Sequence, residues 1–115
     1  MGSRFDQDPD RSRIARGRWG ETLAASHYER RGYIVLDRNW RSPTGELDLV
    51  LRNGPVYVFC EVKTRRSERY GPASAAVGSV KQRRIRRLAL EWLASNRRHG
   101  VDIRFDVVAI TGLYV

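Results

Sequence analysis

The segment from Gly45 to Arg65, GELDLVLRNGPVYVFCEVKTR, constrains the fold of this chain more than any other part of its sequence. Two runs of alternating apolar residues flank Asn53-Gly54, the dipeptide most typical of a two-residue β-hairpin turn. An isolated hairpin is only marginally stable in water, so other elements must pack against these strands. The sequence therefore predicts a sheet built around this hairpin.

The turn determines which residues of the two strands face each other. Side chains alternate between the faces of a strand, and a loop of Asn53 and Gly54 alone would pair Arg52 with Pro55. The same register gives the pairs Val50–Tyr57, Asp48–Phe59 and Glu46–Glu61. One face of the hairpin then carries only apolar residues: Leu47, Leu49, Leu51, Val58, Cys60 and Val62. We expect this face to form part of the core.

Four charged residues, Glu46, Asp48, Glu61 and Lys63, lie on the opposite face, at the end away from the turn. In this register Asp48 and Glu61 are diagonal neighbours about 7 Å apart at the backbone, so both carboxylates can reach one metal ion. Two close carboxylates without a cation would repel each other, and a hard divalent ion such as Mg²⁺ offsets that repulsion. Lys63 is suited to hold a water molecule or a phosphate oxygen.

A solvated outer face with a Glu61–Lys63 ion pair explains the same four charges. Against this alternative, Tyr57 and Phe59 fall on that face and indicate that it is partly covered. The hairpin geometry alone leaves both interpretations open.

The remaining elements follow from their flanking residues. Gly32 is suited to close a helix, and Ser79 with Gln82 three residues later matches the capping-box pattern of a helix start. Gly100 is expected to end the second helix. The expected elements are a helix over residues 18–31, a strand over 33–37, the two hairpin strands, a helix over 79–98 and a strand over 103–110.

The order of these elements, α-β-β-β-α-β, predicts an α/β fold in which a mixed β-sheet is flanked by helices. A chain of 115 residues is long enough for one domain with its own core. Residues 1–17 are polar and are expected to form a flexible basic N-terminal arm. The folded domain is expected to span residues 18–115.

Helical spacing places one lysine apart from its basic neighbours. At 100° per residue, Lys81 shares a stripe with Ile85, Leu88 and Trp92, so it points toward the sheet and away from the arginines of the same helix. A snorkelling side chain at the edge of the core is an equally good explanation.

Glu21 begins a similar stripe of the first helix, with Ala24, Ala25 and Tyr28. This spacing indicates that Glu21 faces the sheet. The alternative is that a glutamate in the first helical turn simply complements the helix dipole.

The formal net charge of +9 and the pI near 10.8 make nucleic acid the first partner to consider, although high arginine use can also reflect genome composition. Twenty of the 22 basic residues are arginine, and lysine occurs only at Lys63 and Lys81. No base-reading motif is present, so phosphate contacts are expected to dominate. The predicted nucleic-acid-binding residues are Lys81, Arg65, Arg66, Arg69, Arg83, Arg84 and Arg87.

The single cysteine, Cys60, allows no disulfide within the chain and indicates a reducing compartment. The sequence has no apolar run of 18 residues, and its N-terminus has no apolar region typical of a signal peptide. We therefore expect a cytoplasmic protein that does not enter a membrane.

Glu21, Asp48 and the Glu61-Val62-Lys63 triplet, in this order of elements, resemble the PD-(D/E)xK nucleases of the restriction-endonuclease-like fold. More closely, four segments are similar to the YraN-like family of small bacterial proteins, which is related in fold to the archaeal Holliday-junction resolvases: GRWGETLAASHYERRGYIVLDRN, GELDLV, VFCEVKTR and RFDVVAI. The resemblance spans residues 17–110, and in place of the Pro-Asp pair of the motif this chain has Glu46-Leu47-Asp48.

This resemblance implies hydrolysis of phosphodiester bonds that depends on Mg²⁺ or Mn²⁺. The implied metal ligands are the carboxylates of Asp48 and Glu61 and the carbonyl of Val62. Lys63 would orient or help to deprotonate the attacking water, and Glu21 would hold a second metal ion or its water. Resolvases of this kind work as dimers, so the resemblance also implies a homodimer, although the sequence indicates no dimer interface.

The leading hypothesis is a metal-dependent endonuclease that acts on branched or flap DNA in repair or recombination. The second is a nuclease-like scaffold that binds nucleic acid or docks a protein without cutting. A third is an unrelated enzyme that the high charge merely keeps soluble. Strong, salt-sensitive binding to nucleic acid separates the first two from the third.

Overall fold

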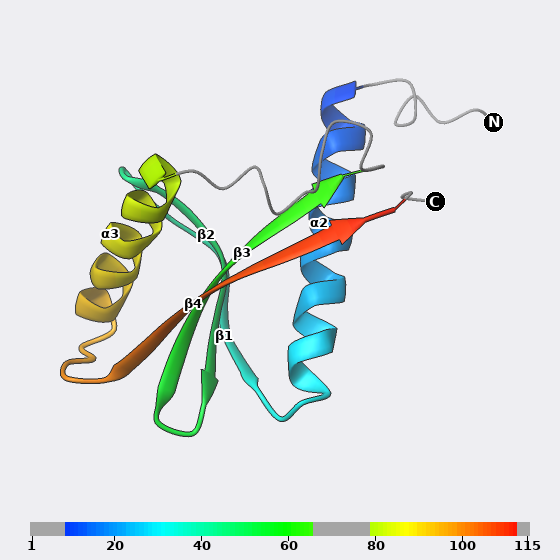
Figure 1. Cartoon of the computed structure of the whole chain (residues 1–115). Coiled ribbons are helices and arrows are strands. Elements are labelled where there is room, and N and C mark those ends of the chain that lie inside the picture. The colour runs from blue at the N-terminus through cyan, green and yellow to red at the C-terminus, as the bar shows by residue number, and fades with distance from the viewer. Residues whose placement is uncertain (1–8, 66–78, 113–115) are drawn as a thin grey trace.

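The structure of the chain is a computed structural model, and it describes residues 9–65 and 79–112. Its elements, in chain order, are α2 (Pro9–Glu29), β1 (Ile34–Ser42), β2 (Gly45–Asn53), β3 (Val56–Arg65), α3 (Ser79–Ser95) and β4 (Asp102–Thr111) (Figure 1). The predicted α-β-β-β-α-β order is confirmed. Neither helix in this part of the chain has the length and apolar composition needed to cross a membrane.

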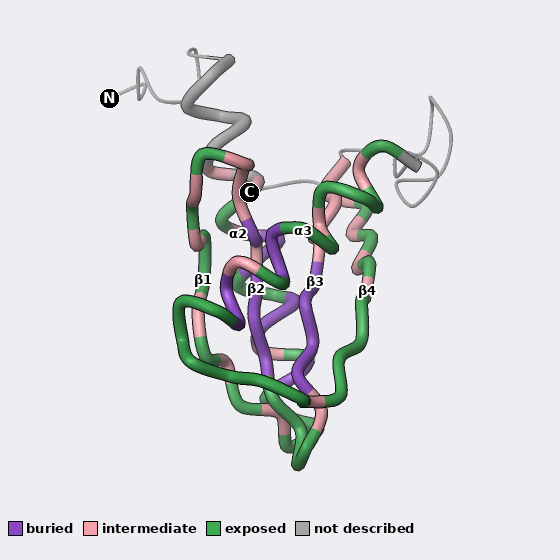
Figure 2. The backbone as a smooth tube through the Cα atoms, turned by 90° about the vertical axis from the view of Figure 1, so that its left-hand side faces the viewer, coloured by how far each residue is buried: buried purple, intermediate pink, exposed green. Residues whose placement is uncertain are grey.

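The four strands form one mixed sheet in the order β1-β2-β3-β4. The pairs β1–β2 and β2–β3 are antiparallel, whereas β3 and β4 are parallel. Parallel neighbours need a long connection, and α3 lies in the one between β3 and β4. Figure 2 shows that the buried residues of the sheet lie in β2 and β3, while β1 and β4 form its edges.

The two helices pack against opposite faces of the sheet (Figure 1). The core cluster on the α2 side contains Ala24, Ala25, Tyr28, Leu49, Leu51, Val58 and Cys60. The cluster on the α3 side contains Leu47, Val50, Tyr57, Phe59, Leu88, Ala89, Trp92 and Leu93. Because both faces are covered, residues 57–60 are buried without a break. The predicted cover over Tyr57 and Phe59 is confirmed.

The hairpin register differs from the predicted one by two residues. Arg52 pairs with Tyr57, so the loop consists of Gly54 and Pro55, and the predicted pair Arg52–Pro55 is wrong. Pro55 has no N–H to donate to the ladder, and Gly54 adopts the left-handed φ of 58° that the turn requires. Val50 pairs with Phe59, so the predicted pairs Val50–Tyr57 and Asp48–Phe59 are wrong as well, and the regular pairing does not extend to the predicted pair Glu46–Glu61. A shift of two residues preserves the alternation of faces.

Leu47 is the one member of the predicted apolar face that packs on the other side of the sheet. Leu49 and Leu51 pack under α2, whereas Leu47 packs under α3. The alternation changes phase beside Asn39 of β1, whose φ is 53° and which lies between the residues that pair with Leu49 and Leu47. The prediction for Leu47 was wrong because a period of two assumes a regular strand.

Three element boundaries differ from the predicted ones by three residues or more. α2 begins at Pro9, well before the predicted start at residue 18, and proline is favoured in a first turn because its missing N–H needs no partner there. Residues 1–8 of the predicted arm lie outside the described residues. β1 continues to Ser42, and α3 ends at Ser95, short of Arg98.

α2 approaches β3 most closely at Gly20. A Cβ atom at this position would collide with the hydroxyl of Thr64, whereas a Cβ at Gly17, one turn earlier, would meet nothing. The missing side chain therefore allows the helix to lie against the strand. This contact fixes the position of the next residue, Glu21.

Candidate functional site

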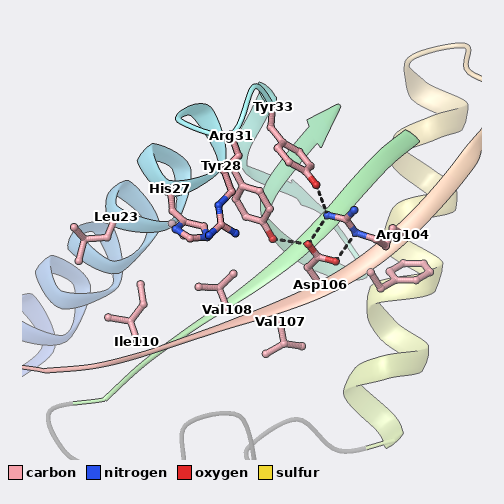
Figure 3. Close-up of a pocket in the computed structure, with 12 residues that line it drawn as sticks. Leu23, His27, Tyr28, Arg31, Tyr33, Arg104, Asp106, Val107, Val108 and Ile110 are labelled. Atoms are coloured by element: carbon pink, nitrogen blue, oxygen red, sulfur yellow. Dashed lines mark hydrogen bonds and ion pairs between the residues drawn. The ribbon is translucent and has the colours of Figure 1, made fainter. Parts of the chain in front are cut away.

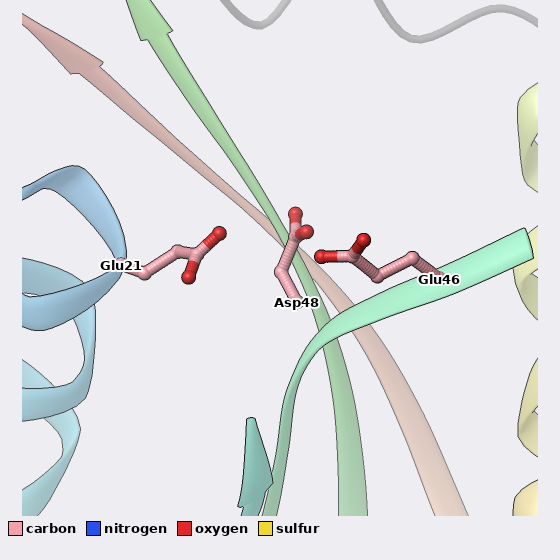
Figure 4. A group of neighbouring side chains, drawn as sticks. All are labelled: Glu21, Glu46 and Asp48. Carbon is pink, nitrogen blue, oxygen red and sulfur yellow. The ribbon is translucent and has the colours of Figure 1, made fainter. Parts of the chain in front are cut away.

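Three carboxylates from two elements meet where the hairpin ends. Glu21 comes from α2, and Glu46 and Asp48 come from β2 (Figure 4). One carboxylate oxygen of each lies within 4.8 Å of the others. Like charges so close together repel each other, and an ion pair of 3.1 Å between Arg41 Nε and Oε2 of Glu46 offsets part of this repulsion.

Glu21 is the most buried of the three, with 9% of its surface exposed. Its Oε2 atom is buried and has no hydrogen-bond partner in the described part of the chain. Burial, and then the charge of Glu46, raise the pKa of Glu21, although a hydrogen bond with Asn39 acts in the opposite direction. The stripe predicted for Glu21 is confirmed, since Ala24, Ala25 and Tyr28 are buried as well.

Asp48 occupies the centre of this group. Burial is the main cause that raises its pKa to about 7, and the neighbouring carboxylates of Glu61, Glu21 and Glu46 contribute to the same rise. The backbone N–H of Val62 donates a hydrogen bond to Oδ2 of Asp48 over 2.7 Å and partly opposes this shift. The pKa of Asp48 therefore lies near neutral pH.

Both lysines of the chain converge on one carboxylate beside this cluster. Lys63 Nζ lies 2.8 Å and Lys81 Nζ 3.9 Å from Oε1 of Glu61. Lys81 reaches it from α3, so its predicted direction toward the sheet is confirmed. The predicted Glu61–Lys63 ion pair is present, but both side chains are only about one fifth exposed and do not form a fully solvated face.

The two ammonium groups differ in acidity. The pKa of Lys81 is lowered, mainly by its contact with Lys63 and next by burial. Burial also acts to lower the pKa of Lys63, but the bonds to Glu61 and Lys81 and the charges of Glu61 and Asp48 outweigh it and raise that pKa. Lys81 is consequently the better proton donor of the two.

The structure brings together some of the predicted site residues and separates others. Glu21 and Asp48 lie together, and Glu61 is bound by lysines instead of joining their cluster. Glu46 takes that third place, although the sequence analysis did not include it among the metal ligands. Its signal was available, because Glu46 precedes Asp48 by two residues and was expected on the same face. The predicted roles of Glu61 and of the Val62 carbonyl as ligands stay predictions.

Arginines of α3 line a hollow beside the start of β2. Arg83, Arg84 and Arg87 surround a volume of about 470 Å³ together with Pro43, Thr44 and Val80. Arg84 lies against Gly45, the residue directly before Glu46. Of the other predicted phosphate-binding residues, Arg65 ends β3, and Arg66 and Arg69 lie outside the described residues.

Asp106 of β4 belongs to a separate network. Its Oδ2 accepts a hydrogen bond from the Tyr28 hydroxyl over 2.6 Å and another from Arg104, which also donates to Tyr33 (Figure 3). These residues border a hollow of about 660 Å³ between α2 and β4. The network holds Asp106 away from the acidic cluster.

The acidic cluster fits a hard divalent cation by its chemistry. All three side chains offer carboxylate oxygens, the ligands that Mg²⁺ and Mn²⁺ prefer, and Oε2 of Glu21 is buried with no hydrogen-bond partner among the described residues. In the described part of the chain this is the only group of three or more acidic, histidine or cysteine side chains close enough to hold a metal ion.

Comparison with known proteins identifies relatives along nearly the whole chain. The sequence model of the uncharacterised protein family UPF0102 matches residues 20–110. A UPF0102 protein of Frankia alni is 52% identical over 101 residues, which are 88% of this chain and 84% of that protein. One from Nocardioides is 52% identical over 96 residues, 84% and 77% of the two chains, and one from Geobacter metallireducens is 50% identical over 95 residues, 83% and 78%. These names state no activity.

Proposed function

The chain belongs to the UPF0102 family, as its YraN-like segments predicted, and because that family is uncharacterised we propose a function from the site itself. The proposal is a metal-dependent endonuclease that hydrolyses phosphodiester bonds of DNA. The observation that carries it is the buried Oε2 of Glu21, which has no hydrogen-bond partner within residues 9–65 and 79–112. Glu21 belongs to a cluster with two more carboxylates, beside the only two lysines of the sequence.

Glu21 and Asp48 are the ligands that both the sequence pattern and the geometry support, and Glu46 completes the cluster. A Mg²⁺ or Mn²⁺ ion bound there would polarise a phosphoryl oxygen and lower the pKa of a bound water. Glu61 remains a candidate ligand that would first have to exchange its lysine contacts. Asp48 must lose the proton that its raised pKa favours before it can bind a cation.

The lysines have the positions to handle the phosphate. Lys63 is held by Glu61 at the edge of the acidic cluster, where its ammonium can donate a hydrogen bond to a nonbridging phosphate oxygen or to the attacking water. Lys81 lies on the same carboxylate, and its lowered pKa suits it to give a proton to the leaving oxygen. Glu61 thus positions both cations.

DNA is the proposed substrate because of the charge around the site. The hollow of Arg83, Arg84 and Arg87 adjoins Gly45, the residue directly before Glu46. A DNA strand with one backbone phosphate bound in this hollow would therefore continue toward the acidic cluster. We further propose that the mixed sheet with its two helices is a restriction-endonuclease-like fold related to the archaeal Holliday-junction resolvases. Branched or flap DNA is the substrate that this relation favours.

A second candidate is a scaffold that binds nucleic acid without cutting it. One observation favours it: Glu61 is already neutralised by two lysines, as a purely structural carboxylate would be. The two candidates make the same prediction for DNA binding and opposite predictions for cleavage.

The decisive experiment incubates the protein with labelled single-stranded, duplex, flap and four-way-junction DNA in Mg²⁺, Mn²⁺ or EDTA. Under the proposed function, cleavage depends on the metal and is lost in Asp48→Ala, Lys63→Ala and Glu21→Gln, while DNA binding persists. Glu29→Gln, an exposed glutamate of the same helix as Glu21, is the matched control and keeps full activity. Binding without cleavage of any substrate would select the scaffold.

A further inference from the structure

The two edges of the sheet differ in how well they resist pairing with another strand. β1 has an irregularity between Val35 and Asp37 and a left-handed residue at Asn39, and both interrupt a ladder of hydrogen bonds. β4 has no such interruption, because residues 102–111 pair with β3 in one unbroken register. Among the residues that the structure describes, no strand pairs with the outer side of β4.

β4 also exposes apolar side chains on its α3 side. Ile103, Phe105 and Val107 are 40%, 36% and 45% exposed, although Phe105 and Val107 border a hollow of about 200 Å³ with residues of α3. Leu90 of α3 is 64% exposed and lines a hollow of about 260 Å³ with Ile103. A row of this kind next to an open edge is typical of a surface that binds another strand.

Two opposite charges alternate with this row on the α2 side. Arg104 donates hydrogen bonds of 2.8 and 2.9 Å to Asp106, and the hydroxyls of Tyr33 and Tyr28 hold the two side chains in place. The segment from Ile103 to Val107 therefore reads apolar, positive, aromatic, negative, apolar. In a second copy that runs in the opposite direction, the positive and negative residues exchange places, so opposite charges of the two copies would face each other.

We propose that the outer edge of β4 binds β4 of a second copy of this chain. The two strands run antiparallel across a two-fold axis at Phe105, so that both sheets join into one. Ile103 then lies opposite Val107 of the second copy, and Arg104 lies opposite Asp106 of the second copy. Such an interface is self-complementary, as a two-fold dimer requires.

Other registers match these residues less well. An axis at Arg104 or at Asp106 puts like charges opposite each other, and an axis between two residues puts charges opposite apolar groups. An axis at Ile103 opposes Arg104 to Asp102, but it pairs only residues 102–104 of β4 and leaves Val107 without an apolar partner. The axis at Phe105 places Arg104 opposite Asp106 and Ile103 opposite Val107, and of the charged residues of β4 in this register only Asp102 faces an apolar residue, Val108.

The test places charges on the proposed axis. Wild-type protein is expected to sediment with twice the monomer mass of 13.3 kDa. Phe105→Glu and Phe105→Lys each put like charges opposite themselves and remove apolar contact, so each should weaken the dimer at least about tenfold. An equimolar mixture of the two variants should dimerise again, because glutamate then faces lysine.

Ile34→Glu is the matched control, since Ile34 is a 60% exposed apolar residue on the opposite edge strand, and it should leave the dimer intact. Phe105 lies 6.0 Å from Phe59 between ring centroids, so circular dichroism must show that its variants are folded. Ile103→Lys mixed with Val107→Glu repeats the test without changing Phe105. Monomeric wild-type protein overturns the proposal, as do single variants that dimerise normally or mixtures that stay monomeric.

Discussion

The backbone N–H of Val62 in β3 donates a hydrogen bond to Oδ2 of Asp48 in β2 over 2.7 Å. Regular pairing of the two strands ends just before this point, at Leu49 and Cys60. The Asp48 side chain therefore serves as the acceptor that a strand carbonyl would otherwise provide. The same carboxylate faces Glu21, so one residue completes the end of the hairpin and begins the acidic cluster.

Asp48→Asn is expected to change how stability depends on pH in the metal-free protein. The pKa of Asp48 rises from 3.8 to about 7 on folding, so between these values the folded state binds more protons than the unfolded state. Its contribution to stability is present below the lower value and is lost as pH rises to about 7, with a slope of at most roughly 1.4 kcal/mol per pH unit. Asparagine preserves the acceptor for Val62 and removes this slope.

Urea unfolding in EDTA at several pH values between 4 and 8 measures this effect. The wild-type free energy of unfolding should decline across the range more steeply than that of the variant. Identical slopes would mean that Asp48 is ionised in the folded protein without a metal ion.

Mg²⁺ or Mn²⁺ is expected to stabilise the wild-type protein above pH 7, because a cation that binds only the folded state adds about 2.7 kcal/mol at a hundredfold excess over its dissociation constant. Glu21→Gln and Glu46→Gln each remove one carboxylate from the cluster and should weaken this metal effect. Glu29→Gln should retain it. Thermal unfolding with increasing metal concentration gives the answer, and an unfolding temperature independent of both metals would remove the basis for a metal site.

Gly20→Ala is expected to destabilise the protein, although alanine is normally the better helix former. The new Cβ would collide with the Thr64 hydroxyl, and even with that hydroxyl rotated away the Thr64 Cβ would lie only 3.3 Å from it, a tight contact. Overpacking of this kind costs about 1–3 kcal/mol. Gly17→Ala, which meets open space, should instead stabilise by about 0.5–1 kcal/mol. Chemical denaturation should show that Gly20→Ala lowers the free energy of unfolding and that Gly17→Ala raises it.

Much of the fold could be predicted from alternation and turn chemistry. The element order, the stripe that begins at Glu21 and the direction of Lys81 all follow from periodicity, and the structure agrees with each. The hairpin turn was misplaced because Asn53-Gly54 is a strong local turn signal. Pro55 lacks the N–H that a paired strand residue donates to its neighbour, so Pro55 lies in the loop with Gly54.

The composition of the acidic cluster depends on contacts that no local pattern contains. Glu46 lies near Glu21 because α2 lies close to the sheet at Gly20, and because the strand changes phase beside Asn39. Glu61 is drawn to Lys81, which lies on a helix distant in sequence. Residue spacing could identify charged positions on the hairpin, but it could not show which of them would meet.

The two lysines offer a test that does not depend on catalysis. Their pKa values shift in opposite directions from the ordinary value of 10.5, with Lys63 raised and Lys81 lowered. Amines react with acetic anhydride only when unprotonated, so Lys81 should acetylate faster than Lys63 in brief labelling at neutral pH. Mass spectrometry can assign both sites, because the chain has no other lysine.

Glu61→Gln extends this test to the shared carboxylate. Without the charge that holds both ammonium groups, the pKa of each lysine should fall, so both should acetylate faster while their order of reactivity is preserved. Glu29→Gln, exposed and distant in sequence, should leave both rates unchanged. Equal rates in the wild type, or rates unaffected by Glu61→Gln, would show that the lysines do not share this carboxylate in solution and that Glu61 is free to bind a metal ion instead.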